Sequence, residues 1–363
     1  MPPIVFLLPS LAHGGAQKVF LEIAHYLAGK GFNVILVSLD REGELLNRIQ
    51  SNLEVVYLDK GLKGRRIKRI VQWFRLHRFV AKRRVTNVVS TLTGMNIFTL
   101  SCFLFAKKVN ITIREANSLE NNPSLLIKSL MWLLYPRANK VIFTSEYVKM
   151  QLLQWRRMER IQVEVLPNPI DIEKIRVQAG KPLQNDGGRV SGKYRVIAVG
   201  RLVKQKGFDV LIDALAIARK TEDIKLVIVG EGPERTYLEE KIKRLQLVDD
   251  VMLVGYKANP YPYISSSDLF VLSSRWEGYV NTVIEAMALG VDIVATDCKS
   301  GPGKLLQEKL NYHLVPVESP GKLAEAILEG LLNPRDTSKF DALLQVHNLP
   351  YAIRRYLGED IAG

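Results

Sequence analysis

The chain has 363 residues, more than a single hydrophobic core usually holds, and two domains are therefore expected. Its apolar fraction of 47% and charged fraction of 24% are typical of a soluble globular protein. No stretch reaches the roughly 18–20 apolar residues of a membrane span, and the start of the chain lacks the basic region of a signal peptide. Two cysteines, Cys102 and Cys298, fit no metal-binding spacing and indicate reduced thiols in a cytosolic protein.

The net charge of +14 lies entirely in the first half of the chain. Residues 1–180 hold 27 basic and 13 acidic side chains, whereas residues 181–363 hold 24 of each. No acidic residue occurs from Lys60 to Arg114. This asymmetry predicts that the first half meets an anionic partner.

Strand-like and helix-like segments alternate along the first half. Residues 3–9 are apolar, Ala16 to Leu27 has helical periodicity, and Val34 to Leu39 is a second apolar run. This order is typical of a parallel sheet with helices on its faces. Further strand-like runs follow at residues 55–58, 88–90, 111–113, 141–143 and 163–166.

Residues 175–193 are rich in Gly, Gln, Asn, Lys and Ser, which predicts a linker or a surface excursion. The alternation then begins again. Strands are expected at residues 196–199, 226–229, 251–254, 269–272 and 293–295, and helices at 208–219, 234–245 and 281–289. The sequence thus predicts two doubly wound α/β domains that bind ligands at the carboxyl ends of their strands. The cleft between the domains is the expected active site.

Two turns between a strand and a helix could hold a phosphate. Gly14 and Gly15 would let backbone N–H groups approach an anion at a helix start, although a tight turn without a ligand has the same pattern. The absence of a G-x-G-x-x-G motif argues against a nicotinamide or flavin enzyme. In the second domain Arg201 and Lys206 follow a strand, where two cations could hold a diphosphate. A solvated basic loop is the alternative.

Two glutamates lie on either side of a predicted helix start. Glu277 stands in the loop before the helix, and Glu285 stands about one turn inside it, within an apolar run. Helix N–H groups around Val280, Asn281 and Thr282 could receive an anion. A carboxylate is a good acceptor for sugar hydroxyls, and a buried Glu285 needs such a partner, a nearby cation or a backbone amide.

These motifs together resemble the family-4 retaining glycosyltransferases, which have the GT-B fold of two Rossmann-like domains facing across a cleft. The resemblance covers nearly the whole chain and is strongest from Gly200 to Pro302. Glu277 and Glu285 form the E-x₇-E signature of that family, and GGAQKV at Gly14 resembles its glycine turn. The other matching stretches are GRLVKQKGFDVLIDALA, LVIVGEGPER, VGYKANPYPYISSSDLFVLSSRWEGYVNTVIEAMALG and VATDCKSGP.

The resemblance implies a role for each part of the chain. Residues 1–170 would form a basic, membrane-facing acceptor domain, and residues 190–340 would form the nucleotide-sugar domain. Residues 341–363 would form a helical tail that packs back on the first domain. Arg201 and Lys206 would bind the diphosphate of the donor. The other implied donor-binding residues are Gly14, Gly15, Tyr256, Val280, Asn281, Thr282 and Glu285, of which Glu285 would bind the ribose.

The resemblance also implies a catalytic site without a metal. Glu277 would lie beside the donor sugar, and Arg114, Glu115 and Asn117 stand where many relatives place a His near the reacting centre. No D-x-D pair is present to hold a divalent ion, so neither a metal nor a cofactor is expected. Cations and helix N-termini would offset the charge of the leaving diphosphate. The chain departs from the family pattern at positions 280 and 292, where Pro is common, and at Lys304, which reverses a charge.

A basic segment in the first domain predicts a membrane contact. Ile67, Ile70, Val71 and Phe74 recur at helical spacing, with basic residues around them. This pattern is typical of a helix on an anionic membrane, although the same apolar stripe could pack on the sheet. The candidate membrane or acceptor contacts are Lys63, Arg65, Arg66, Lys68, Arg69 and Arg75. Binding of nucleic acid is not expected, because no aromatic residues are interleaved for stacking. The apolar residues 95–105 are either a core helix or the wall of an acceptor channel.

We therefore expect a metal-independent, retaining hexosyl- or N-acetylhexosaminyltransferase. It would move a sugar from a nucleotide-diphosphate donor, such as a UDP-sugar, to a membrane-associated, lipid-linked glycan. The resemblance implies a role in cell-surface polysaccharide biosynthesis, as a cytoplasmic protein bound peripherally to the inner face of the cytoplasmic membrane. The alternatives are a nucleotide-sugar epimerase and a catalytically silent relative of the same fold that binds membranes or proteins.

Overall fold

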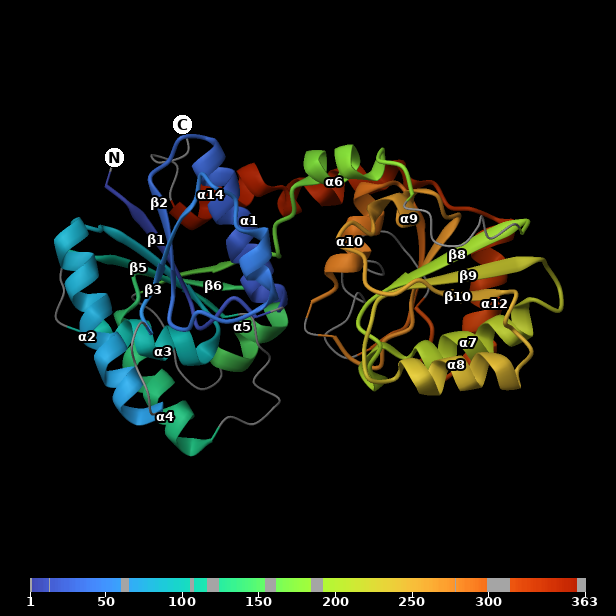
Figure 1. Ribbon diagram of the computed structural model, residues 1–363, viewed down its shortest axis with the longest axis horizontal. Helices are drawn as coiled ribbons and strands as arrows, with labels where there is room; N and C mark the ends of the chain where they lie inside the picture. Colours follow the sequence, from blue (N-terminus) through green and yellow to red (C-terminus); the bar gives the residue numbers. More distant parts are fainter. Residues whose placement is uncertain are drawn as a thin grey trace. The chain divides into compact units, whose positions relative to one another are not determined.

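The computed structural model describes residues 2–12, 14–59, 65–104, 108–115, 124–153, 161–183, 192–277, 279–298 and 314–357, except for the side chains of Arg65, Arg66 and Tyr147. The chain divides into two compact units (Figure 1). The first unit is Met1–Ile170 with Val346–Gly363, and the second is Asp171–Gln345. Each unit is built on a parallel β-sheet, which confirms the α/β class and the two Rossmann-like domains.

The first sheet has seven parallel strands in the order β3-β2-β1-β4-β5-β6-β7. Its strands are β1 (Ile4–Leu8), β2 (Val34–Ser38), β3 (Glu54–Tyr57), β4 (Asn87–Thr91), β5 (Asn110–Glu115), β6 (Lys140–Phe143) and β7 (Gln162–Val165). Strands β1 and β2 are fully buried apolar runs, because helices cover both faces of a parallel sheet. The order reverses between β1 and β4, and such a switch point is where these sheets bind ligands.

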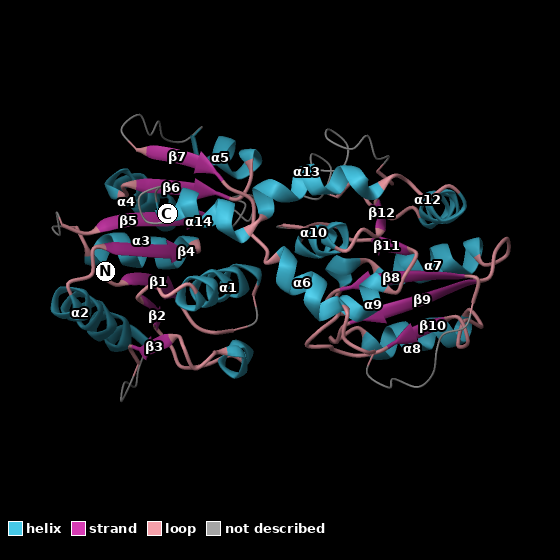
Figure 2. Ribbon diagram, turned by 90° about the horizontal axis from the view of Figure 1, so that it is seen from above, coloured by secondary structure: helices cyan, strands magenta, loops and turns pink. Residues whose placement is uncertain are grey.

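Helices pack on both faces of the first sheet (Figure 2). One core includes residues of α2 (Arg65–Arg83), α3 (Thr93–Cys102), α4 (Leu125–Leu134) and α5 (Glu146–Leu153). A second core includes α1 (Gly15–Gly29) and the last described helix, α14 (Leu349–Leu357). The apolar residues of α3, such as Met95 and Leu100, belong to the first core, so this segment is a core helix.

The second sheet has five parallel strands in the order β10-β9-β8-β11-β12. Its strands are β8 (Tyr194–Val199), β9 (Ile224–Val229), β10 (Val251–Leu253), β11 (Leu269–Leu272) and β12 (Asp292–Ala295). One core holds α7 (Phe208–Ala218), α8 (Arg235–Arg244) and α12 (Pro320–Leu332). The opposite side carries α6 (Ile172–Ala179), α9 (Tyr261–Ser265), α10 (Asn281–Ala288) and α13 (Phe340–Leu344) (Figures 1 and 2).

The predicted linker at residues 175–193 is wrong in its first part, because α6 runs through residue 179. The side chain of Asp171 caps this helix by accepting a hydrogen bond from the Lys174 N–H at 3.0 Å. An aspartate before a helix start is a recognised capping signal. The helix buries little beyond Ile175, and its apolar pattern is correspondingly weak.

Candidate functional site

The candidate site lies at the switch point of the second sheet, between β8 and β11. The loop after β8 carries Arg201 and Lys206, and the loop after β11 carries Glu277. Because β8 and β11 are parallel neighbours, both loops leave the same edge of the sheet. Open α/β sheets bind their ligands at this position.

The two loops touch through their backbones at Gly207. This glycine has a φ of 61°, and a Cβ there would lie 2.1 Å from the Ser273 carbonyl oxygen. Only a glycine permits both the left-handed backbone and this close approach. Ser273 Oγ also donates to the Lys206 carbonyl at 2.8 Å, and Gln205 Nε2 donates to the Trp276 carbonyl at 2.9 Å. The loop that carries Lys206 is therefore held directly against the loop that carries Glu277.

Lys206 and Glu277 form an ion pair inside this junction. Lys206 Nζ lies 2.6 Å from Glu277 Oε1, and Ser274 Oγ donates to the same oxygen at 2.5 Å. The glutamate is only 7% exposed. The sequence predicted both residues at the site but did not predict that they bind each other. An ammonium held beside a carboxylate retains donors for a second anion, because it has three.

Three other predicted donor-binding residues of the second unit differ in their exposure and contacts. Arg201 is exposed and makes no ion pair with any residue that the structure describes. Glu285 lies in α10, is 4% exposed and accepts a hydrogen bond from the Tyr261 hydroxyl at 3.4 Å. Tyr256 follows Gly255, whose φ is 77°, and is 52% exposed. Glu285 is thus a buried carboxylate that accepts a hydrogen bond from an uncharged hydroxyl.

The start of α10 has features of an anion site. Val280 occupies the N-cap position, no described side chain caps the helix, and its first turn contains no acidic residue. The first N–H groups of a helix lack intrahelical acceptors and lie at the positive end of the helix dipole. Asn281 and Thr282, the first two helical residues, were predicted to receive an anion, and the helix start places their N–H groups in this turn.

The structure describes Asp292, where the family commonly has Pro, but not Lys304, which reverses a charge of the family pattern. Asp292 is buried and accepts hydrogen bonds from Arg335, at 3.1 Å from its backbone N–H and at 3.4 Å from Nη1. This carboxylate therefore attaches the segment after α12 to the start of β12. Lys304 lies outside the described residues.

The first unit also has a glycine turn at its switch point. Gly14 is the N-cap of α1, and Gly15 is the first residue of that helix, shortly after β1. No described side chain caps the helix, and no acidic residue occurs in its first turn. The predicted phosphate-accessible turn is therefore placed at a helix start, as the sequence indicated.

Arg114 and Glu115 lie at the end of β5, and neither side chain is exposed. Arg114 donates to Thr91 Oγ1 at 3.2 Å and to the Asn168 side-chain oxygen. Glu115 accepts from Thr93 Oγ1 at 2.8 Å and from the Tyr135 hydroxyl at 2.5 Å. These contacts form an internal network at the end of β5, and a catalytic role for either residue stays a prediction. Asn117 lies outside the described residues.

Burial of Tyr135 and the adjacent Glu115 carboxylate raise the pKa of the Tyr135 hydroxyl well above its usual range. The tyrosine therefore stays protonated and serves as a donor to Glu115.

Helix α2 turns its predicted apolar stripe outward. Ile67, Ile70 and Phe74 are 69%, 59% and 63% exposed. The helix instead packs on the unit through Leu76, Val80 and the buried amide of Gln72. Gln72 Nε2 donates to the Leu39 carbonyl at 2.6 Å. The alternative that the stripe packs on the sheet is therefore wrong for these three residues.

The predicted basic contacts of α2 differ among themselves. Lys68 and Arg69 pair with Asp40 at 2.9 Å and 3.4 Å, so part of their charge is neutralised within the unit. Arg75 donates to the Leu58 carbonyl at 2.9 Å. Arg65 and Arg66 begin α2, but their side chains are not described, and Lys63 lies outside the described residues.

Helix α4 has a second exposed apolar surface that the sequence analysis did not single out. Leu125, Leu126, Trp132 and Leu133 are between 53% and 81% exposed. Only Met131 and Leu134 of this helix are buried. Helices α2 and α4 both contact α3, so they belong to the same side of the first sheet. Exposed apolar patches of this kind mark sites of interaction.

In the part of the chain that the structure describes, no helix is both long and apolar enough to cross a bilayer. Within the same residues, no three His, Cys, Asp or Glu side chains form a group that could hold a metal. The metal-independent chemistry expected from the sequence remains a prediction.

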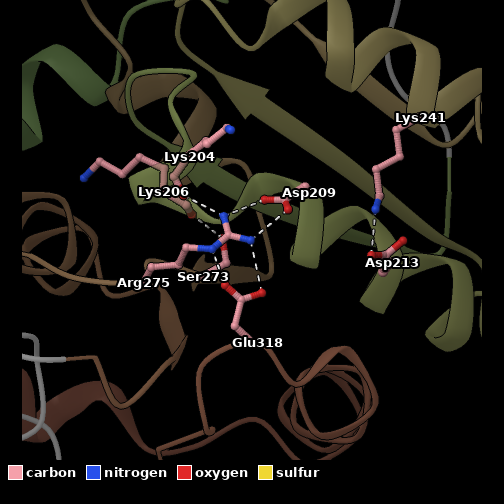
Figure 3. Close-up of polar contacts among 8 residues, drawn as sticks. All are labelled: Lys204, Lys206, Asp209, Asp213, Lys241, Ser273, Arg275 and Glu318. Carbon is pink, nitrogen blue, oxygen red and sulfur yellow. Dashed lines mark hydrogen bonds and ion pairs between the residues drawn. The ribbon is translucent and has the colours of Figure 1, made fainter.

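Sequence reasoning missed Arg275, which stands two residues before Glu277 (Figure 3). Its guanidinium forms a two-bond pair with Asp209, with both distances 2.8 Å, and it also binds Glu318. Burial raises the pKa of the Asp209 carboxyl, but its hydrogen bonds with Arg275 and that residue's charge outweigh this and lower the pKa overall. Two features of the sequence could have indicated this pair. They are an Arg beside the E-x₇-E motif and an Asp in the first helical turn after Gly207.

Comparisons with known proteins agree with this architecture. A family model described as Glycosyl transferases group 1 matches residues 181–342, and one described as Glycosyltransferase Family 4 matches residues 13–174. The crystal structure of Anabaena HepE in complex with UDP has a TM-score of 0.80, with 20% identity over 99% of each chain. Sucrose-phosphate synthase from Thermosynechococcus elongatus has a TM-score of 0.74, with 18% identity over 99% of this chain and 98% of that one.

Two curated relatives are more similar in sequence. An uncharacterized glycosyltransferase of Methanocaldococcus jannaschii is 33% identical over 179 residues, which are 49% of this chain and 44% of that protein. The second is the N-acetylgalactosamine-N,N'-diacetylbacillosaminyl-diphospho-undecaprenol 4-alpha-N-acetylgalactosaminyltransferase of Campylobacter jejuni. It is 33% identical over 65% of this chain and 64% of its own length. The chain thus spans 44% and 64% of the lengths of these two relatives.

The fold, the switch-point loops and the structural neighbours define a GT-B protein. The two family models follow one another along the chain and leave few residues unmatched. The chain belongs to the glycosyltransferases of the family-4 type, as its sequence resemblance implied.

Proposed function

We propose that this protein is a retaining glycosyltransferase that moves a sugar from a UDP-sugar to a lipid-linked glycan at a membrane surface. The observation that carries the proposal is the Lys206–Glu277 ion pair. It lies at the switch point of the second sheet, shortly before the start of α10, which no described side chain caps. A diphosphate needs cations and helix N–H groups, and a sugar needs carboxylate acceptors.

Each of these groups has a separate role in the proposed reaction. Lys206 and Arg201 bind the diphosphate, and Glu285 accepts the ribose hydroxyls from within α10. Glu277 faces the donor sugar. When a diphosphate binds, it shares the Lys206 ammonium with Glu277, so the ion pair sets where the phosphate and the sugar meet. Positive groups fixed before the reaction stabilise the charge that develops on a leaving diphosphate.

The proposed chemistry balances without a further reactant. The bond between the anomeric carbon and the diphosphate oxygen breaks, and a bond to the acceptor oxygen forms on the same face. The proton of the acceptor hydroxyl moves to the departing diphosphate. No metal takes part in this scheme, in which Lys206, Arg201 and the start of α10 supply the positive charge.

A lipid-linked acceptor is supported by the first unit and by a relative. The Campylobacter relative is named for an undecaprenol-linked substrate. In this chain the outward Ile67, Ile70 and Phe74 of α2 stand among basic residues, and α4 adds exposed Trp132 and Leu133. Apolar side chains that enter the interface and cations that meet anionic headgroups are the two terms of reversible membrane binding. We propose that α2 and α4 hold the protein at the inner face of the cytoplasmic membrane.

A nucleotide-sugar screen tests the donor half of the proposal. UDP-sugars at millimolar concentration should raise the melting temperature of the wild-type protein, because a ligand that binds only the native state stabilises it. Lys206→Met should lose this shift, whereas Lys220→Met should keep it, since Lys220 lies after α7 and outside the site. No shift with any nucleotide-sugar would contradict the proposal.

Product analysis then separates the alternatives. With a membrane extract, transfer should release UDP and label a lipid-soluble product with the anomeric configuration of the donor. Conversion of one UDP-sugar into another without UDP release would favour an epimerase. Donor binding with neither product would favour a catalytically silent relative.

A further inference from the structure

The guanidinium of Arg275 joins three segments of the second unit and uses all five of its N–H groups to do so (Figure 3). Nη1 donates to the Lys204 carbonyl at 2.6 Å and to Asp209 Oδ1 at 2.8 Å. Nη2 donates to Asp209 Oδ2 at 2.8 Å and to Glu318 Oε2 at 3.1 Å, and Nε donates to Glu318 Oε1. A guanidinium has five N–H donors, so Arg275 has none left for a ligand.

Both carboxylates hold the cation in its charged form. Hydrogen bonds to Asp209 and then to Glu318 raise the pKa of Arg275 further above its usual value. Asp209 belongs to the first turn of α7, and Glu318 immediately precedes the N-cap of α12. The backbone of Glu318 is left-handed, with a φ of 56°, which a residue with a side chain adopts only when its surroundings hold it there. Arg275 therefore connects its own loop to two helix starts.

The backbone of Arg275 is fixed as well. Its N–H donates to the Gln205 carbonyl at 2.8 Å, next to the bond from Nη1 to Lys204. One residue beyond Gln205 is Lys206, and two residues beyond Arg275 is Glu277. The 2.6 Å ion pair between those side chains thus spans two loops that Arg275 fastens together.

We propose that Arg275 is a positioning residue that sets the placement of Lys206 relative to Glu277. This inference rests on the proposed function for its catalytic meaning. Arg275 adds no donor to the site, and Asp209 and Glu318 neutralise its charge. Its effect is geometric, and it needs the planar fork: a lysine has one nitrogen and cannot reach Lys204, Asp209 and Glu318 together.

A labelling experiment tests the positioning without relying on activity. Cys298 lies close to this junction, and burial together with the nearby Glu277 charge raises the pKa of its thiol to about 11. In Arg275→Lys, iodoacetamide should label Cys298 about tenfold faster, because the loops open more often. Cys102, buried in the first unit, serves as the internal reference and should keep its rate.

Arg219→Lys is the matched control. Arg219 also pairs with a carboxylate, Asp250 at 2.7 Å, but it lies at the opposite end of α7 from Asp209. This variant should label at the wild-type rate. Unchanged labelling of Cys298 in Arg275→Lys would overturn the claim that Arg275 holds the junction.

A double-mutant cycle separates positioning from a general structural role. Arg275→Lys should lower kcat/KM for the donor by about 10- to 100-fold, because a small misplacement of reacting groups is costly. In a Lys206→Met background the same substitution should cost less than about threefold, since no ammonium remains to be placed. An equal loss in both backgrounds would overturn the positioning role and leave the proposed function standing. A wild-type protein that neither binds a UDP-sugar nor transfers from one would overturn both.

Discussion

The two units of this protein differ in the surroundings of their basic side chains. In the first unit, α2 has eight basic and no acidic residues, and its outward face also exposes Ile67, Ile70 and Phe74. In the second unit, Lys206 and Arg275 lie against carboxylates of the same unit. A cluster whose cations are held by its own carboxylates is preformed. On α2 the charge is neutralised within the unit only in part, by Asp40 and Glu54. Exposed cations beside apolar side chains gain both neutralisation and burial from a partner. The charged residues of the second unit therefore form a preformed site around Lys206, Arg275 and Glu277. The basic residues of α2 in the first unit lie on a surface suited to an anionic, apolar partner.

The largest effect on activity is expected when the preformed site of the second unit loses the Glu277 carboxylate. Glu277→Gln keeps the size of the side chain but removes the charge that holds Lys206. We expect kcat for sugar transfer to fall by about 10²- to 10³-fold, the range found when one stabilising group is removed from an active site. Initial rates with a UDP-sugar and a membrane extract measure the loss.

The control for this prediction is Glu239→Gln, which removes an exposed carboxylate of α8 that pairs with Arg235. Its activity should match that of the wild type, because surface ion pairs contribute little. A Glu277→Gln rate within about threefold of the wild type would show that the ion pair is structural and not part of the chemistry.

The next largest effect is expected on membrane binding through the exposed apolar side chains of α2 and α4 in the first unit. Phe74→Glu places a charge where an apolar side chain would enter the bilayer, and burial of a Phe contributes about 1.5–3 kcal/mol. Binding to anionic vesicles should therefore weaken by about tenfold or more, with little change in melting temperature. Trp132→Glu on α4 should act in the same direction. Co-sedimentation with vesicles that contain phosphatidylglycerol measures both.

Val177→Glu is the matched control in the second unit. Val177 is 71% exposed, slightly more than Phe74, but it lies on α6 and has no basic helix around it. Its substitution should leave vesicle binding unchanged. Equal losses in Phe74→Glu and Val177→Glu would mean that added charge alone weakens binding and that α2 is no specific membrane contact.

Periodicity predicted the sheets well because the buried parallel strands are runs of Val, Ile and Leu. It could not predict which face of α2 packs inward. The helix buries Gln72, whose amide has acceptors at Leu39 and Asp40, and it leaves the apolar stripe outside. A polar residue becomes a core residue only where another segment supplies its hydrogen-bond partners. That segment is about 30 residues away in the chain.

The site was predicted residue by residue but not as a network. Motif and spacing placed Lys206 and Glu277 at the same edge of the second sheet. Their mutual ion pair joins residues 71 positions apart, and the bond between Arg275 and Glu318 joins residues 43 positions apart. Such pairs depend on loop geometry, which a single sequence does not specify. The buried settings of Arg114 and Glu115 could not be predicted for the same reason.

A smaller effect is expected at Glu285, the carboxylate inside α10. Glu285→Ala should weaken UDP binding by about tenfold, because hydrogen bonds to a charged group contribute about 1.5–3 kcal/mol. Calorimetry with UDP and with 2',3'-dideoxy-UDP sharpens the test. The wild type should prefer UDP, and the variant should bind both nucleotides equally. A variant that keeps the preference would exclude Glu285 as the ribose acceptor.

Tyr261→Phe is the control for that measurement, since Tyr261 donates to Glu285 at 3.4 Å. This variant should retain the preference for UDP because the carboxylate remains. Unfolding of Glu285→Ala, with Tyr261→Phe stable, would mark the glutamate as a structural residue of α10.

The smallest effect is a pH dependence in the preformed cluster. Because the pKa of Asp209 is lowered in the folded protein, its contribution is fully present above the unfolded pKa of about 3.9. It is lost as the pH falls through the folded pKa. Asp209→Asn should therefore destabilise α7 by about 1–2 kcal/mol at pH 7, and the difference from the wild type should shrink toward pH 3. Hydrogen exchange of α7, compared between variant and wild type at each pH, measures this locally.

Asp341→Asn is the control: it removes a carboxylate that is 76% exposed, and it should change the hydrogen exchange of α7 little at either pH. A constant difference between Asp209→Asn and the wild type from pH 7 to pH 3 would mean that the Asp209 charge does not hold Arg275.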